Sequence, residues 1–256
     1  MTNYIRSEIY RNIHSKGIYI FTIVCSSLVL LCEVIMRSFH VMHYEGLKMI
    51  YNNMIDGGFA VVFSFCPLFF SITFGDEAKN HTLKNSVAYG ISRKEIYFAK
   101  LFTSVFFGTI SYIIIIAILI IGSYILPFDK SNMLYLKQLI LSFIYVMPLL
   151  ILLISFCNCL YFIFHREGVI VSIWTIAIAV PALMGNHAKQ DNFLKAVLNY
   201  SPINMIIDTC FNKEKGMYIL KLCTDEGLRR CLIVSAVGIV VSYAIGLIVF
   251  NKKEIK

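Results

Sequence analysis

Long uncharged runs alternate with short polar segments along the chain. Residues 59–74 and 101–128, for example, contain no charged residue. Runs of this length and polarity are typical of helices that cross a membrane. We predict six such spans, at about residues 18–36, 58–74, 101–126, 139–164, 169–184 and 231–250. The predicted fold is therefore an all-α integral membrane protein with six transmembrane helices, and residues 1–256 form a single transmembrane domain.

The composition supports a membrane protein. Hydrophobic residues make up 58% of the 256 residues, and charged residues only 15%. Soluble domains are about 45–50% apolar and about 25% charged. The mean hydropathy is +0.74. Because spans and short connections use nearly every residue, there is no room for a sizeable soluble domain.

A polar segment, residues 75–100, separates the second predicted span from the third. Ser92 and Glu95 have the spacing of a capping box at a helix N-terminus. Gly90, just before them, suits the end of a preceding helix, where a positive φ is needed. These signals predict a helix over about residues 76–89, a break at Gly90 and a new helix that begins at Ser92. We interpret the segment as a cytoplasmic handle for a soluble partner. An ordinary solvated loop fits these features equally well.

The first 17 residues carry Ile5, Ile9 and Ile13 at i, i+4 spacing, with polar residues on the other faces. This pattern predicts an amphipathic helix that lies in the membrane interface. The alternative is the basic region of a signal peptide, but no small-x-small cleavage site follows the apolar run.

Two residues within the first two spans are candidates for gating or for the transport pathway. Glu33 lies in the first span, where an acid is a functional candidate by default. Glu33 lies about one turn from the end of the span. There its side chain can extend to the aqueous interface, so the free-energy cost of its charge is small. Pro67 lies in the middle of the second span, where proline often marks a kink. His40 and His43 lie in the loop between the first and the second span. Their spacing fits metal ligation on a helix poorly, so we expect no metal site.

The longest polar stretch, residues 186–230, contains two half-apolar pieces at residues 193–198 and 205–211. Each piece is too short to cross a membrane, but it can dip into the membrane without crossing it. Ser201-Pro202, between them, is a plausible helix start and a further candidate for gating. Residues 213–230 are predicted to form one surface helix. Cys210 and Cys223 can form a disulfide if this loop faces an oxidising compartment.

The last predicted span carries Val234, Gly238, Ser242 and Gly246 at every fourth position. Small residues at this spacing allow another helix to approach closely. A lipid-facing helix with incidental glycines is the alternative.

The basic residues indicate the orientation in the membrane. With six spans both termini lie on one side. If that side is the cytoplasm, the short connections and tails carry 12 basic residues inside and four outside, and the other seven lie in the long loop. This bias favours cytoplasmic termini. The net charge of +8 is explained by this topology and by anionic lipid headgroups, and no nucleic-acid-binding motif is present.

Motifs for catalysis are missing from the sequence. No Gly-Lys dipeptide occurs, which excludes a phosphate-binding P-loop, and HExxH and GxSxG motifs are also absent. Glu33 has no second acid near it within the spans. We therefore expect that the chain is not an enzyme by itself and does not power transport.

The order of elements, together with the motif Asp76-Glu77-x-Lys79-x-x-Thr82-Leu83-Lys84 followed by Ser92-Arg93, resembles the membrane subunit of the type-2 ABC exporter family. The similarity is to the short bacterial kind with six spans and covers essentially the whole chain. One departure is His81, where the family commonly has glycine.

The resemblance implies an assembly of two permeases, either two copies or a copy and a paralogue, with two separate ATP-binding subunits that hold ATP and Mg²⁺. It also implies a cytoplasmic coupling helix in the polar segment, re-entrant outer helices that cap the exit, and location in a bacterial cytoplasmic membrane. The residues that it assigns to ATPase coupling are Asp76, Glu77, Lys79, Thr82, Leu83, Lys84, Ser92 and Arg93.

Small permeases of this type often export antimicrobial or other amphipathic peptides, or protect the producing cell from them. We expect such a cargo here. Drugs, lipids, polysaccharides and ions remain alternatives. A rival function is a membrane sensor or scaffold that binds a cytoplasmic partner through residues 75–100. A membrane-embedded enzyme is a second rival, and it predicts that Glu33→Gln abolishes activity without disturbing assembly.

Overall fold

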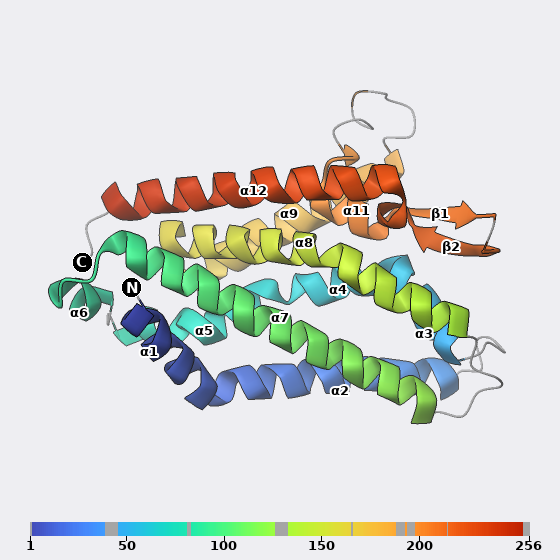
Figure 1. The fold of residues 1–256 in the computed structure, drawn as a ribbon, viewed down its shortest axis with the longest axis horizontal. Helices are drawn as coiled ribbons and strands as arrows, with labels where there is room; N and C mark the ends of the chain where they lie inside the picture. The colour runs from blue at the N-terminus through green and yellow to red at the C-terminus, as the bar shows by residue number, and fades with distance from the viewer. Residues whose placement is uncertain are drawn as a thin grey trace.

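The computed structural model describes residues 2–38, 46–80, 83–125, 133–164, 166–187, 193, 198–213 and 215–252. Most of these residues are helical, and a small hairpin of two strands accompanies the helices. The all-α prediction is therefore confirmed in its coarse form. Figure 1 shows the long helices lying lengthwise beside one another.

Four helices of the described residues are long and apolar enough to cross a membrane: α7 (Arg93–Ile125), α8 (Met133–Phe164), α9 (Glu167–His187) and α12 (Asp225–Lys252). A fifth candidate is formed by α1 (Thr2–His14) and α2 (Lys16–Ser38), which meet at a bend of 55°. These helices cover five of the six predicted spans. The number of crossings stays a prediction.

The second predicted span, residues 58–74, is not one continuous helix. This part of the chain forms α3 (Gly46–Asn53), the π-helix η1 (Met54–Gly58), α4 (Phe59–Ser64) and α5 (Cys66–Asn80). Gly57 within η1 has a φ of 142°, which only glycine adopts readily. Pro67 is the second residue of α5. Because proline has no N–H and its ring clashes with the preceding turn, the helix breaks at Phe65.

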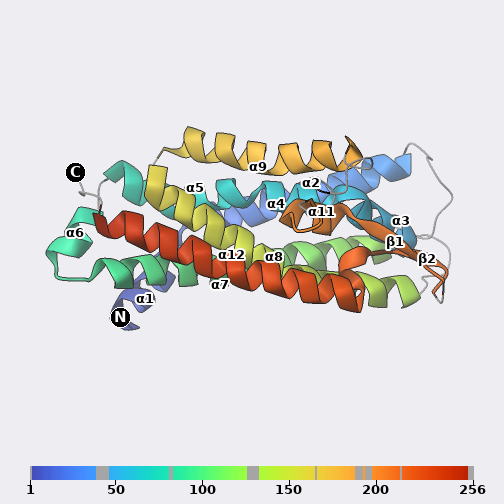
Figure 2. The same cartoon turned by 90° about the horizontal axis from the view of Figure 1, so that it is seen from above.

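Helix α8 lies in the middle of the bundle. Half of its most apolar stretch is buried, a larger share than in α7, α9 or α12. Figure 2 shows α9 along one face of the molecule and α12 along the opposite face. An all-apolar helix is typical of a buried position and of a membrane span, and α8 combines the two.

The small-residue face of α12 packs against α8 and α7. A Cβ atom at Gly238 would collide with the side chain of Leu152, and one at Gly246 would collide with the phenol of Tyr97. The hydroxyl of Tyr97 donates to the carbonyl of Ser242 at 3.3 Å. The predicted close approach of another helix to this face is therefore confirmed.

The predicted helix start at residue 76 is wrong, because α5 includes Asp76 and continues to Asn80. Residues 81–82 lie outside the described residues, and the short helix α6 (Leu83–Ala88) follows them. Nothing in residues 74–80 stops a helix, so the hydrogen-bond ladder of the apolar run continues into the polar segment. At the end of α6, Gly90 has a φ of 81°. Its N–H donates to the carbonyl of Val87 and that of Ile91 to the carbonyl of Ser86, which is a Schellman motif.

Residues 198–223 differ most from the prediction. Helix α11 (Pro202–Ile207) is followed by an antiparallel pair of strands, β1 (Thr209–Asn212) and β2 (Met217–Leu220), and by the 3₁₀-helix η3 (Lys221–Cys223). The surface helix predicted over residues 213–230 is therefore wrong, and the helical piece predicted at 205–211 ends at Ile207. The turn explains the difference, because Asn212 accepts from the N–H groups of the loop and Gly216 has a φ of 63°. Of the other predicted piece, residues 194–197 lie outside the described residues.

The hairpin is fastened to α3 and α8. The hydroxyl of Tyr51 donates to the carbonyl of Tyr218 at 2.9 Å, and the Lys215 ammonium donates to the side-chain carbonyl of Gln138 at 2.9 Å. Cys210 and Cys223, considered for a disulfide, are free thiols. The Cys223 thiol lies 3.6 Å from the Ser142 hydroxyl. Burial raises the pKa of this thiol, which keeps it protonated at neutral pH.

Candidate functional site

The junction between the polar segment and α7 is built as the sequence predicts. The N–H of Glu95 donates to the hydroxyl of Ser92 at 3.3 Å, and the N–H of Ser92 donates to the carboxylate of Glu95 at 3.3 Å. The capping box is therefore confirmed. Together with the turn at Gly90, it fixes the direction in which the chain enters α7.

Arg93, the first residue of α7, is bound to the end of α12. Its guanidinium donates to the carbonyl oxygens of Phe250 at 2.7 Å and Asn251 at 2.9 Å, and it lies over the Phe250 ring. Carbonyls in the last turn of a helix have no partner within the helix and favour a positive charge. Arg93 therefore joins the start of α7 to the end of α12.

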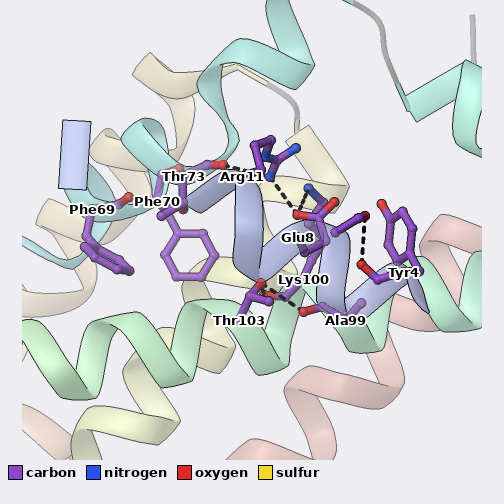
Figure 3. A network of polar contacts seen from close by, with 10 residues as sticks. Tyr4, Glu8, Arg11, Phe69, Phe70, Thr73, Ala99, Lys100 and Thr103 are labelled. Atoms are coloured by element: carbon purple, nitrogen blue, oxygen red, sulfur yellow. Dashed lines mark hydrogen bonds and ion pairs between the residues drawn. The ribbon is translucent and has the colours of Figure 1, made fainter. Parts of the chain in front are cut away.

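Helix α1 lies across both helices that flank the polar segment. The Glu8 carboxylate accepts from the Lys100 ammonium of α7 at 2.7 Å and from Arg11 at 2.7 Å. Arg11 also donates to the backbone carbonyl of Thr73 in α5 at 3.4 Å. Figure 3 shows these groups between the three helices. We call Glu8, Arg11, Lys100 and Thr73 the α1 strap.

Burial makes the ion pair of the α1 strap unusual. Glu8 is 4% exposed and Lys100 is 1% exposed. A buried charge that loses its partner is strongly destabilising, so each of these two groups holds the other in place. Because Lys100 lies two turns into α7 and Glu8 in the middle of α1, the pair fixes the position of α1 against α7.

Sequence analysis did not find the α1 strap. It assigned the apolar face of α1 to Ile5, Ile9 and Ile13, whereas the fully buried residues are Glu8 and Asn12, and Ile13 is 45% exposed. One signal was available. Lys100 is the last charge before a long uncharged run, so burying it requires an acid from elsewhere in the chain.

The residues assigned to ATPase coupling fall into two groups. Ser92 and Arg93 are described in full, and both serve contacts within the chain. Asp76, Glu77 and Lys79 lie in the last turns of α5, and Leu83 and Lys84 in the first turn of α6, but only their backbone is described. Thr82 lies outside the described residues. Their contacts with an ATPase remain predictions.

The gating candidates come from three different elements of the structure. Pro67 is buried at the start of α5, and it lines a small pocket with Tyr161 and Ile170. Ser201 precedes α11 and Pro202 is its first residue, as predicted. Figure 1 shows α11 toward the end of the bundle opposite α6. Glu33 lies in α2, and its side chain lies outside the described part of the chain.

At one end of the bundle, a short polar helix connects α5 with α7. α1 binds both of these helices, and α7 in turn binds the end of α12. These contacts join the ends of α1, α5, α7 and α12 beside the polar segment of a helical protein whose long helices are apolar enough to cross a membrane. The chain matches the model of the ABC-2 family transporter protein over residues 4–184. It belongs to this family, whose members are membrane components of ABC transporters. No curated protein gives a significant match to the chain.

Proposed function

We propose that the chain is the permease subunit of an ATP-driven exporter, and that α6 with the adjoining end of α5 is the docking site for a separate ATP-binding subunit. Family membership supports the general role. The observation that carries the docking site is that α5 and α7, the helices that this short helix connects, are bound to each other through α1, and that α7 is also bound to the end of α12. A partner bound there contacts the ends of helices that cross most of the bundle.

The proposal extends to the assembly. Two permeases, identical or paralogous, bind two ATPase subunits that carry ATP and Mg²⁺. Both termini lie in the cytoplasm of a bacterial cell, on the side of α6. Asp76, Glu77, Lys79 and Lys84 supply polar contacts to the ATPase, with Thr82 and Leu83 between them. Ser92 and Arg93 take part in coupling by shaping the junction through their contacts within the chain.

The proposed cargo is an antimicrobial or other amphipathic peptide, moved out of the cell for export or self-protection. Such a cargo suits a small permease rich in apolar residues. Drugs, lipids, polysaccharides and ions are the alternatives, and a cargo screen with the reconstituted transporter distinguishes them.

Co-purification with the ATPase encoded beside this chain tests the docking site. The variants are Asp76→Ala with Glu77→Ala, and, as a matched control, Asp225→Ala with Glu226→Ala, which removes two exposed acids from the first turn of α12. We expect the wild type and the control to retain the ATPase. The first variant should release it or lose the stimulation of ATP turnover in lipid.

Two outcomes contradict the proposal. If no ATPase co-purifies with the wild type, the chain is not an exporter subunit of this kind. Residues 75–100 would then be used in affinity capture to find another cytoplasmic partner. If the ATPase binds but both double variants behave alike, docking takes place elsewhere.

A further inference from the structure

An apolar cavity of about 380 Å³ lies inside the bundle, apart from the polar end described above. Its walls come from α2, α3 with η1, the start of α5, and the middle parts of α7 and α8. Cavities of about 300–1,000 Å³ are the size at which proteins bind small molecules. Well-packed interiors seldom leave a void of this size.

The break in the second predicted span creates the cavity. Met54 and Gly58 of η1 and Cys66 at the start of α5 line it. A straight helix through this region would present a continuous surface to α2. The π-helix and the interruption at Phe65 instead leave a space between α2, α7 and α8. Gly108 of α7 closes the far wall, since a Cβ atom there would touch Ile154 at 2.7 Å.

The lining offers few hydrogen-bonding groups. None of the lining residues is charged, and the polar side chains among them are those of Asn53, Tyr112 and Ser111, whose hydroxyl accepts from Thr22 at 3.1 Å. Most peptide groups placed there would lose their water without gaining a partner, at a cost of roughly 2–7 kcal/mol for each group by transfer scales. The cavity therefore disfavours a peptide and favours a hydrocarbon.

The shape of the cavity is elongated. On α7 the lining extends from Gly108 to Leu119, a rise of roughly 16 Å at 1.5 Å per residue. On α2 it extends from Phe21 to Val29, roughly 12 Å by the same measure. A long narrow apolar space fits a linear chain better than a compact ring system.

The cavity is also next to lipid. It is partly open, and α2, which forms one wall, exposes mainly apolar side chains on its outer face near the cavity: Ile20, Ile23, Val24 and Leu31 are 47–66% exposed, and the hydroxyl of the exposed Ser27 donates to the backbone carbonyl of Val24. On a membrane-crossing helix that face contacts the hydrocarbon of the bilayer. A lipid chain can reach the cavity without passing through water.

We propose that this cavity binds one acyl chain of a membrane lipid. Burial of the chain completes the packing between α2, α7 and α8 that the broken helix leaves unfinished. Tyr112 adds one polar group to the wall, and its hydroxyl is buried without a hydrogen-bond partner among the described residues. The proposal does not depend on an ATPase or on the identity of the cargo.

Photolabelling tests the proposal. The full chain is purified into nanodiscs that contain phosphatidylcholine with a diazirine on one acyl chain, irradiated and mapped by mass spectrometry. We expect saturable labelling on the peptides that contain residues 21–29 and 108–119, and displacement by excess palmitic acid. Cys25→Phe, which fills the cavity from α2, should reduce this labelling at least fivefold. Val24→Phe, on the exposed face of the same helix, is the matched control and should leave it unchanged.

A second measurement needs no variant. Cys25 and Cys66 line the cavity, whereas Cys231 is buried at the start of α12, away from it. Palmitic acid should slow alkylation of Cys25 and Cys66 by N-cyclohexylmaleimide severalfold and leave Cys231 unaffected. The proposal is overturned if labelling occurs only on outer faces, if Cys25→Phe and Val24→Phe label alike, or if neither thiol is protected. Displacement by a synthetic amphipathic peptide but not by palmitic acid would instead assign the cavity to cargo.

Discussion

Glu8 is the acid on which the arrangement of the first helix depends. Its carboxylate accepts from Lys100 and Arg11, and it is 4% exposed. A charge buried to this degree is stable only with its partner, since burial of a lone charge in an apolar surrounding costs several kcal/mol. Removal of Glu8 alone therefore has a larger effect than removal of Glu8 together with Lys100.

A double-mutant cycle measures this coupling. Glu8→Gln alone removes the carboxylate partner of the buried Lys100 ammonium and should lower the free energy of unfolding by about 3–5 kcal/mol, whereas Lys100→Met alone should cost less, because Glu8 keeps its ion pair with Arg11. The double variant Glu8→Gln with Lys100→Met should be closer to the wild type than Glu8→Gln alone. Unfolding in mixed micelles by added SDS provides the measurement. Additive single effects would show that the two groups do not interact.

Arg93 is the second residue with a distinct role. Arg93→Gln should weaken the last turn of α12 by about 1–2 kcal/mol, since the carbonyls of Phe250 and Asn251 lose a charged donor. Hydrogen exchange of the amides in residues 247–252 should speed up accordingly. Lys94→Gln, a change of the neighbouring exposed base, is the control and should leave exchange in α12 unaltered.

Helix α12 shows how the packing of an element depends on small side chains. Gly246→Ala should destabilise the protein by about 1–3 kcal/mol, because the new methyl group overlaps the phenol of Tyr97. Gly168→Ala in α9 places the same methyl group in open space and should be stabilising by up to about 1 kcal/mol. Thermal unfolding of the two variants in detergent compares them directly, and shifts of the same sign would contradict the packing that we describe.

Signals that depend on neighbouring residues correctly predicted where several helices begin and end. The capping box at Ser92, the turn at Gly90 and the helix start at Ser201-Pro202 depend on a few neighbouring residues, and all three are present in the structure. The small-residue face of α12 depends on a period along one helix, which is also local information. Signals of this kind are visible before the chain is folded.

Long-range contacts could not be predicted in the same way. The Glu8–Lys100 pair joins residues 92 positions apart, and on a helical wheel Glu8 belongs with the polar residues of α1. The hairpin β1–β2 was missed because its strands have four residues each, too short for a clear alternation of apolar and polar positions. The break at Phe65 was partly foreseen, since Pro67 marks a kink but does not reveal the π-helix before it.

At the scale of the whole molecule, the α1 strap makes the first helix part of the proposed coupling apparatus. Arg11 contacts α5 and Glu8 contacts α7, so α1 bridges the two helices that α6 connects. A displacement of α6 by a partner then moves α1 as well. Because α2 follows α1 after a single residue, the motion continues into the wall of the apolar cavity.

This linkage predicts a separation of binding from coupling in the assembled transporter. Glu8→Gln should leave co-purification of the ATPase intact, because the docking residues are unchanged, and should reduce cargo-stimulated ATP turnover severalfold. Glu226→Gln removes an exposed acid paired with Arg230 at the start of α12 and is the control. Stimulated turnover at the wild-type level in a folded Glu8→Gln transporter would show that α1 does not take part in coupling.

The distance between Glu8 and Lys100 along the chain also has a consequence for biosynthesis. The acid is synthesised first, and its partner follows 92 residues later, which is roughly 5–20 s at ribosomal rates of about 5–20 residues per second. During that interval Lys100 has not been synthesised, so the Glu8 carboxylate cannot form its buried ion pair with the Lys100 ammonium. The nascent helix must wait at the surface of the bilayer, and it can reach its final position only after the ribosome has released most of α7 to the insertion machinery.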